Sequence, residues 1–230
     1  MSVTVAVFLV VVYWDVSEGE PVDFLFRWGF IPCEVTRGRP ITDIERTFTE
    51  AGLHHACFEQ ERGLAVFPQK RPILSAATAI FVHTDSTHLL STVALLLAAG
   101  WFLERRCPHR GLGRRYWCHA SVFGTYLVGG VSGAIVTTVL DPTSSRPAVG
   151  GSGGVAGLLG VCAVVAVLRS ERPLRKGGYI LALVVIAAAL EYLSSEWLAF
   201  CGHMLGFLAG AGLAGGYAAA VSRCRRRPGG

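Results

Sequence analysis

The 230-residue chain has few charged residues. Asp, Glu, Lys and Arg make up 16% of it and hydrophobic residues 52%, whereas an ordinary soluble domain is about 25% charged. This composition excludes an intrinsically disordered chain and a solvated coiled coil. The seven cysteines form no Cys-x-x-Cys pair and no metal-type grouping with histidine, so we expect no zinc module, no metal and no cofactor.

The net charge of +5 would suggest nucleic acid as a partner in a soluble protein. Here the basic residues are concentrated between long uncharged runs, and their placement explains the charge better. We therefore expect a lipid bilayer as the environment and no nucleic-acid partner.

Uncharged runs are the main structural signal. A helix needs about 20 apolar residues to cross about 30 Å of hydrocarbon. Charge is absent from residues 116–140, Pro147–Leu168 and Trp197–Ser222. Two shorter runs, Ser86–Leu103 and Gly177–Leu190, can also span if flanking charged side chains reach towards the headgroups. These five runs predict five membrane spans.

The apolar run Ser2–Trp14 would reach only roughly 20 Å as a helix, so it predicts a short first span. A signal peptide is the alternative, but no basic residue precedes the run and no Ala-x-Ala site follows it. The prediction is an all-α, polytopic membrane protein with six transmembrane helices. Its expected parts are a first span (1–14), a long outer loop with a membrane-associated segment (15–85), spans two to six (86–222) and a basic cytoplasmic tail (223–230).

Basic residues in short loops mark the cytoplasmic side of a membrane protein. Three connections are rich in them: the second-to-third (Arg105, Arg106, Arg110, Arg114, Arg115), the fourth-to-fifth (Arg169, Arg172, Arg175, Lys176) and the tail (Arg223, Arg225, Arg226, Arg227). This pattern predicts that both termini are cytoplasmic and that the first, third and fifth loops face outward.

Three polar residues lie at the predicted outer ends of spans. Ser152 is flanked by glycines, which indicates either helix packing through Gly153 and Gly157 or a nucleophile beside a helix N-terminus. His203 shares a helix face with two glycines, in the order His203-x-x-Gly206-x-x-x-Gly210.

His88 opens the second span. A lone membrane histidine can simply hydrogen-bond a neighbouring helix, but ionisable residues at such a depth are functional candidates. The common depth of His88, Ser152 and His203 favours a single site over separate packing roles.

These residues resemble the rhomboid intramembrane serine proteases. The matching marks are Gly150-Gly151-Ser152-Gly153, the His203, Gly206 and Gly210 spacing, His83 followed by His88-Leu89-Leu90, Gly100-x-x-x-Glu104, and Arg27-Trp28-Gly29-Phe30-Ile31-Pro32. The likeness covers about residues 27–216. It implies a six-helix bundle that cleaves membrane-anchored substrates with a Ser–His dyad recessed below the outer surface.

The resemblance also implies roles for individual residues. Ser152 is the nucleophile and His203 the general base, without a third acidic member. The Ser152 backbone N–H and His88 stabilise the oxyanion, next to Gly151. Gly153, Gly157, Gly206 and Gly210 are expected to bring the fourth and sixth helices together.

Three positions depart from the family pattern. Thr92 stands where an asparagine usually points into the oxyanion hole, and Ala156 stands where an aromatic residue often stacks on the base. Lys70-Arg71 stands where a Trp-Arg pair is common, and a solvated or headgroup-binding pair is at least as good an interpretation of those two side chains. Cys33 and Cys57 share the outer loop, where spacing alone does not decide whether they form a disulfide.

The sequence therefore favours an intramembrane serine endopeptidase acting on transmembrane protein substrates. An inactive rhomboid-like scaffold that binds transmembrane segments is the alternative, and a small transporter or channel subunit is the third, although inverted repeats are lacking. A bias towards Ala, Gly, Arg and Val predicts a bacterial plasma membrane, with the site facing outside. The oligomeric state is left open.

Overall fold

The computed structural model describes residues 21–59, 63–105, 112–193 and 197–226. These ranges are helical, with two isolated β-bridges and no strand. The elements in chain order are α2 (Pro21–Trp28), α3 (Pro32–Arg37), α4 (Asp43–Glu50), α5 (Pro72–Thr78), the 3₁₀ turn η1 (Ala79–Phe81), α6 (Ser86–Glu104), α7 (Leu112–Leu140), α8 (Ser152–Leu168), α9 (Pro173–Leu193) and α10 (Trp197–Arg226). The predicted first span, residues 1–14, lies outside the described ranges.

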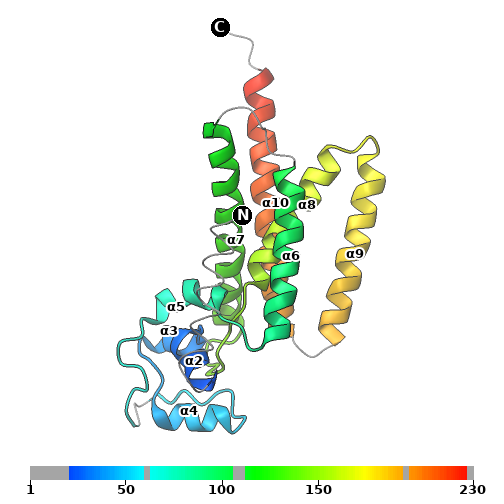
Figure 1. The fold of residues 1–230 in the computed structure, drawn as a ribbon. Coiled ribbons are helices and arrows are strands. Elements are labelled where there is room, and N and C mark those ends of the chain that lie inside the picture. Colours follow the sequence, from blue (N-terminus) through cyan, green and yellow to red (C-terminus); the bar gives the residue numbers. More distant parts are fainter. Residues whose placement is uncertain (1–20, 60–62, 106–111, 194–196, 227–230) are drawn as a thin grey trace.

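Three helical segments are long and apolar enough to cross a membrane, namely Ser86–Glu104, His119–Leu140 and Trp197–Ala219. The helix α8 is a shorter apolar helix of 17 residues, and α9 has 21 residues. In Figure 1, α6, α7 and α10 run side by side and α9 stands at the edge of the bundle. The predicted all-α membrane bundle is confirmed.

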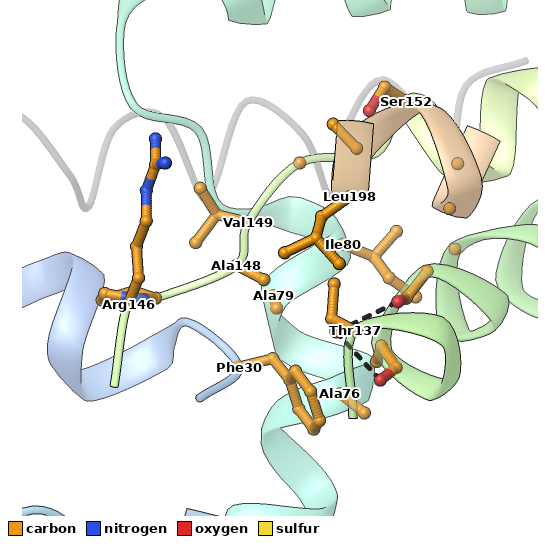
Figure 2. Close-up of a pocket in the computed structure, with 18 of the residues that line it drawn as sticks. Phe30, Ala76, Ala79, Ile80, Thr137, Arg146, Ala148, Val149, Ser152 and Leu198 are labelled. Carbon is orange, nitrogen blue, oxygen red and sulfur yellow. Dashed lines mark hydrogen bonds between the residues drawn. The ribbon is translucent and has the colours of Figure 1, made fainter. Parts of the chain in front are cut away.

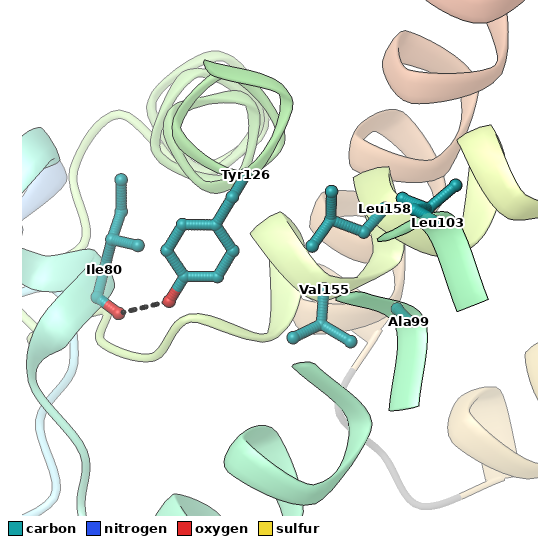
Figure 3. Packing of buried hydrophobic residues seen from close by; sticks show 6 residues of the cluster. All are labelled: Ile80, Ala99, Leu103, Tyr126, Val155 and Leu158. Carbon is teal, nitrogen blue, oxygen red and sulfur yellow. Dashed lines mark hydrogen bonds between the residues drawn. The ribbon is translucent and has the colours of Figure 1, made fainter. Parts of the chain in front are cut away.

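The helix α8 is the central element, because it packs against α6, α7, α9 and α10. Most of its buried residues are glycines, and small residues allow neighbouring helices to come close. Its larger buried side chains, Val155 and Leu158, meet Ala99 and Leu103 of α6 and Tyr126 of α7 (Figure 3). This cluster holds α6, α7 and α8 together.

The helices α2 to α5 gather at one end of the bundle, where α7 ends and α6 begins (Figure 1). Pro32 and Pro72 lie in the first turns of α3 and α5, where a proline loses no helical hydrogen bond. A capping box of Thr42 and Glu45 begins α4. A small core of Phe26, Ile31, Cys33 and Ile41 joins α2, α3 and the chain before α4, and we name residues 21–59 and 63–82 the α2–α5 unit.

Two ion pairs of this unit involve buried carboxylates. Lys70 Nζ is 2.7 Å from Glu34 Oε2, and the two side chains are only 3% and 1% exposed. Burial raises the pKa of Glu34 and lowers that of Lys70, because a charged group loses hydration there. The interpretation of Lys70 as a solvated or headgroup-binding residue is therefore wrong: it ties the chain before α5 to α3. Arg39 pairs with the buried carboxylate of Glu45 in the same way.

Candidate active site

The chain turns sharply before α8. Ala148 pairs with Phe30 through two backbone hydrogen bonds of 3.0 and 2.7 Å. Gly150 then adopts φ +115°, which favours glycine, and α8 begins at Ser152. The apolar run that begins at Pro147 is therefore not helical over its first five residues, because its start pairs with the α2–α5 unit instead.

Ser152 and His203 are in direct contact. The distance between His203 Nε2 and Ser152 Oγ is 2.6 Å, although the two residues are 51 positions apart. With the ring proton on Nδ1, the serine hydroxyl donates this bond to Nε2. Ser152 stands at the first position of α8, and Gly151 before it provides no side-chain cap for the first N–H groups of that helix.

Glycine contacts between helices set this distance. A Cβ at Gly210 would overlap the Gly157 carbonyl, and a Cβ at Gly206 would overlap the Gly153 carbonyl. The structure thus places the four predicted packing glycines at one contact between α8 and α10. At such a contact only glycine lets the backbones touch.

Sequence reasoning missed two members of this packing. A Cβ at Gly129 of α7 would lie 2.7 Å from the Gly153 carbonyl oxygen, and one at Gly160 would overlap the Phe207 carbonyl. The sequence could have indicated a packing role for Gly160, because it follows Gly157 by three residues on the same helix. Gly129 could also have been found, because Gly133 follows it in a Gly-x-x-x-Gly spacing on the same helix.

His88 lies in the first turn of α6, where its backbone N–H donates to the Asp85 side chain at 2.8 Å. Its ring faces the turn before α8, because a Cβ at Gly150 would lie 3.0 Å from His88 Nε2. His88 and Ser152 line the same cavity. Thr92, one turn further along α6, is 3% exposed and is not among the residues that line that cavity.

The sequence analysis also left His83 without a role. Its Nε2 accepts the Gly151 N–H at 3.5 Å, and its ring packs edge-on against His88 at 5.0 Å between centroids. Burial, and then the proximity of His88, lowers the pKa of His83 to about 4. His83 is therefore neutral at pH 7, as an acceptor for a backbone N–H requires.

The Ser152–His203 pair opens into a cavity of about 500 Å³, which is in the range of ligand sites. Figure 2 shows it extending from Ser152 past Val149 towards Phe30 and Thr137. Most of its lining is apolar, and Asp141 and Arg146 contribute charged side chains of opposite sign.

The α2–α5 unit holds the loop that leads into α8. Ser145 is completely buried: its N–H donates to the His54 carbonyl at 2.7 Å, and its Oγ accepts from the Ala56 N–H at 3.2 Å. Next to it, the Cys33 N–H donates to the Ser144 carbonyl at 3.0 Å. Cys33 also forms a disulfide with Cys57, so a covalent bond joins the two segments of the α2–α5 unit that hydrogen-bond to this loop.

Removing that disulfide is expected to weaken the contacts between the α2–α5 unit and the loop before α8. The variant Cys33→Ala/Cys57→Ala lacks the disulfide that links residues 24 positions apart, so its unfolded chain is less restricted. The free energy of unfolding should therefore fall by about 3 kcal/mol. Labelling of Ser152 by a serine-directed fluorophosphonate should slow several-fold, because the loop before the serine loses its support. Chemical denaturation and labelling rates measure the two effects.

The control for the disulfide variant is Cys162→Ala, which removes a cysteine of α8 that forms no disulfide. The stability of that variant and its rate of Ser152 labelling should both stay close to those of wild type. Unchanged stability and labelling in the double variant would show that the disulfide does not support the loop.

The fold and site together define a helical membrane protein with a hydrogen-bonded Ser–His pair beside a helix N-terminus. The Rhomboid domain family matches residues 70–220, so the chain belongs to the rhomboid family. This family contains intramembrane serine proteases and related inactive homologues. No curated protein and no solved structure matches the chain.

Proposed function

We propose that the protein is an intramembrane serine endopeptidase that hydrolyses peptide bonds in or near transmembrane segments. The observation that carries this proposal is the 2.6 Å contact between His203 Nε2 and Ser152 Oγ at the end of a cavity. A nucleophile within hydrogen-bond reach of its base is the geometry that acyl transfer requires. Membership of the rhomboid family supports the same reaction.

In this mechanism His203 takes the proton of Ser152 as its oxygen attacks the carbonyl carbon of the scissile bond. The resulting oxyanion is held by the Ser152 backbone N–H, with His88, which lines the same cavity, as a second donor. His203 then gives the proton to the leaving amine, and water hydrolyses the acyl-enzyme by the same route in reverse. His83 acts indirectly, because its bond to the Gly151 N–H fixes the turn before the nucleophile.

The substrates are membrane-anchored proteins whose transmembrane segments contain small or helix-breaking residues. An intact helix shields its carbonyl carbons within its own hydrogen bonds, so a local break is needed before attack. The pattern of basic loops supports a site at the outer face of the membrane, with both termini in the cytoplasm, and the bias towards Ala, Gly, Arg and Val supports a bacterial plasma membrane. The α2–α5 unit then lies on the outer side.

An inactive scaffold is the competing function, and the position of Thr92 favours it. Thr92 stands where the family usually has an oxyanion asparagine, and it does not line the cavity. Loss of one oxyanion donor lowers rates by about 10²–10³-fold in a serine protease. The retained contact between Ser152 and His203 supports the protease, because binding a segment requires no such contact.

Labelling with a fluorophosphonate separates the two functions. Purified wild type should be labelled at Ser152, Ser152→Ala should not be labelled, and His203→Ala should be labelled at least about 100-fold more slowly, since general-base catalysis contributes about 10²–10⁴-fold. Labelled peptides identified by mass spectrometry are the readout. Absence of labelling in wild type that unfolds cooperatively, or equal labelling of Ser152→Ala, would favour the scaffold.

A further inference from the structure

A second cavity lies at the end of the bundle opposite the α2–α5 unit (Figure 1). It is bounded by the last turn of α6, the last turn of α8 and the first turns of α9, and its volume is about 540 Å³. Two aromatic, three basic and one small side chain line it: Trp101, Phe102, Arg105, Arg169, Lys176 and Ala166. No carboxylate is among these described lining residues.

Helix dipoles explain only two of the three basic side chains that line this cavity. Arg105 and Arg169 follow the C-termini of α6 and α8, where cations are favourable. Lys176 is different, because it lies near the N-terminus of α9, where a cation is unfavourable and where no acidic residue occupies the first turn. The N-terminus of α9 and the three basic side chains therefore all favour an anion in the cavity.

The aromatic residues place this cavity at the level of lipid headgroups. Trp101 is 54% exposed, and the Arg105 guanidinium carbon lies 3.9 Å from the centre of its ring. Exposed tryptophan is typical of the membrane–water interface. The 19 residues of α6 span about 28 Å, so Arg105 lies one membrane thickness from the start of that helix. Leu97, one turn before Trp101, is exposed on the same helix face towards the hydrocarbon.

We propose that this cavity binds the phosphate headgroup of an anionic phospholipid. Arg105 and Lys176 approach the phosphate from α6 and α9, and Arg169 approaches it from α8. The acyl chains extend along the apolar surface that includes Leu97. Basic pockets between transmembrane helices recognise anionic headgroups in this way. The site is separate from the Ser152–His203 pair and does not depend on protease activity.

The test is native mass spectrometry of the full-length protein in a neutral detergent with added lipid. Wild type should bind phosphatidylglycerol at least about 10-fold more tightly than phosphatidylcholine, and inorganic phosphate should not compete at matched concentration. In Arg105→Gln/Lys176→Gln the affinity for phosphatidylglycerol should fall about 10- to 30-fold. The variant Arg105→Lys/Lys176→Arg should retain binding.

Arg172→Gln/Arg175→Gln is the matched control, because it removes two basic residues at the same end of the bundle that do not line the cavity. Its affinity should fall less than about 3-fold. Equal losses in the two glutamine variants would show general surface attraction and overturn the site. Equal binding of the two lipids would do the same, and competition by inorganic phosphate would assign the cavity to a free anion instead of a lipid.

Discussion

Replacing Ser152 or His203 with alanine is expected to reduce peptide-bond cleavage at least about 10³-fold. The two side chains share one hydrogen bond, and the Ser152 hydroxyl attacks efficiently only when His203 takes its proton. The double variant should consequently be no slower than the Ser152→Ala variant, because residues that act as one unit are strongly non-additive. Initial rates on a transmembrane reporter substrate measure this.

Two matched variants control this prediction. Ser132→Ala removes a hydroxyl that bonds only within α7 in the described structure, and His54→Ala removes an exposed histidine of the α2–α5 unit. Both should keep rates within about 3-fold of wild type. A double variant of Ser152 and His203 whose loss equals the product of the two single losses would show that they act independently, against the dyad.

Gly210→Ala should have the second largest effect. The added methyl would overlap the Gly157 carbonyl, and backbone atoms cannot rotate away as a flexible side chain can. We expect stability to fall by about 1–3 kcal/mol from overpacking. Activity should fall by about 10²-fold, because pushing α10 away from α8 by about 1 Å moves His203 out of reach of Ser152.

Gly212→Ala and Gly215→Ala are the controls for Gly210→Ala, since a Cβ at either position of α10 meets nothing within 4 Å. Both should be neutral or stabilising by up to about 1 kcal/mol, because glycine weakens a helix interior. Thermal unfolding and reporter cleavage give the two readouts. Equal behaviour of all three variants would show that close contact of α8 and α10 does not set the site.

The bundle was predictable from sequence because a membrane forbids charge over long runs. The run Ser86–Leu103 differs from α6 by one residue, and α10 begins at Trp197 as its run does. Other boundaries differ, because the end of an uncharged run is not the end of a helix. The helix α9 starts at Pro173, four residues before the uncharged run that predicted it. The helix α10 continues to Arg226, within the predicted basic tail.

The α2–α5 unit could not be predicted in this way. It is held by pairs of residues that are distant in sequence, such as Glu34 with Lys70 and Cys33 with Cys57. No local periodicity of the sequence indicates which residues form such pairs. The role of Ser145 is equally hidden, since its partners come from residues about ninety positions earlier. The Ser152 and His203 positions were accessible because flanking glycines and helix spacing mark them directly.

Cleavage by the purified protein in liposomes tests the central claim most directly. The substrate is a reporter whose transmembrane segment contains small and helix-breaking residues, and mass spectrometry of the products locates the cut. Our account predicts a cut within or next to that segment by wild type, and none by Ser152→Ala. An intact reporter after incubation with folded wild type, across several such substrates, would contradict it.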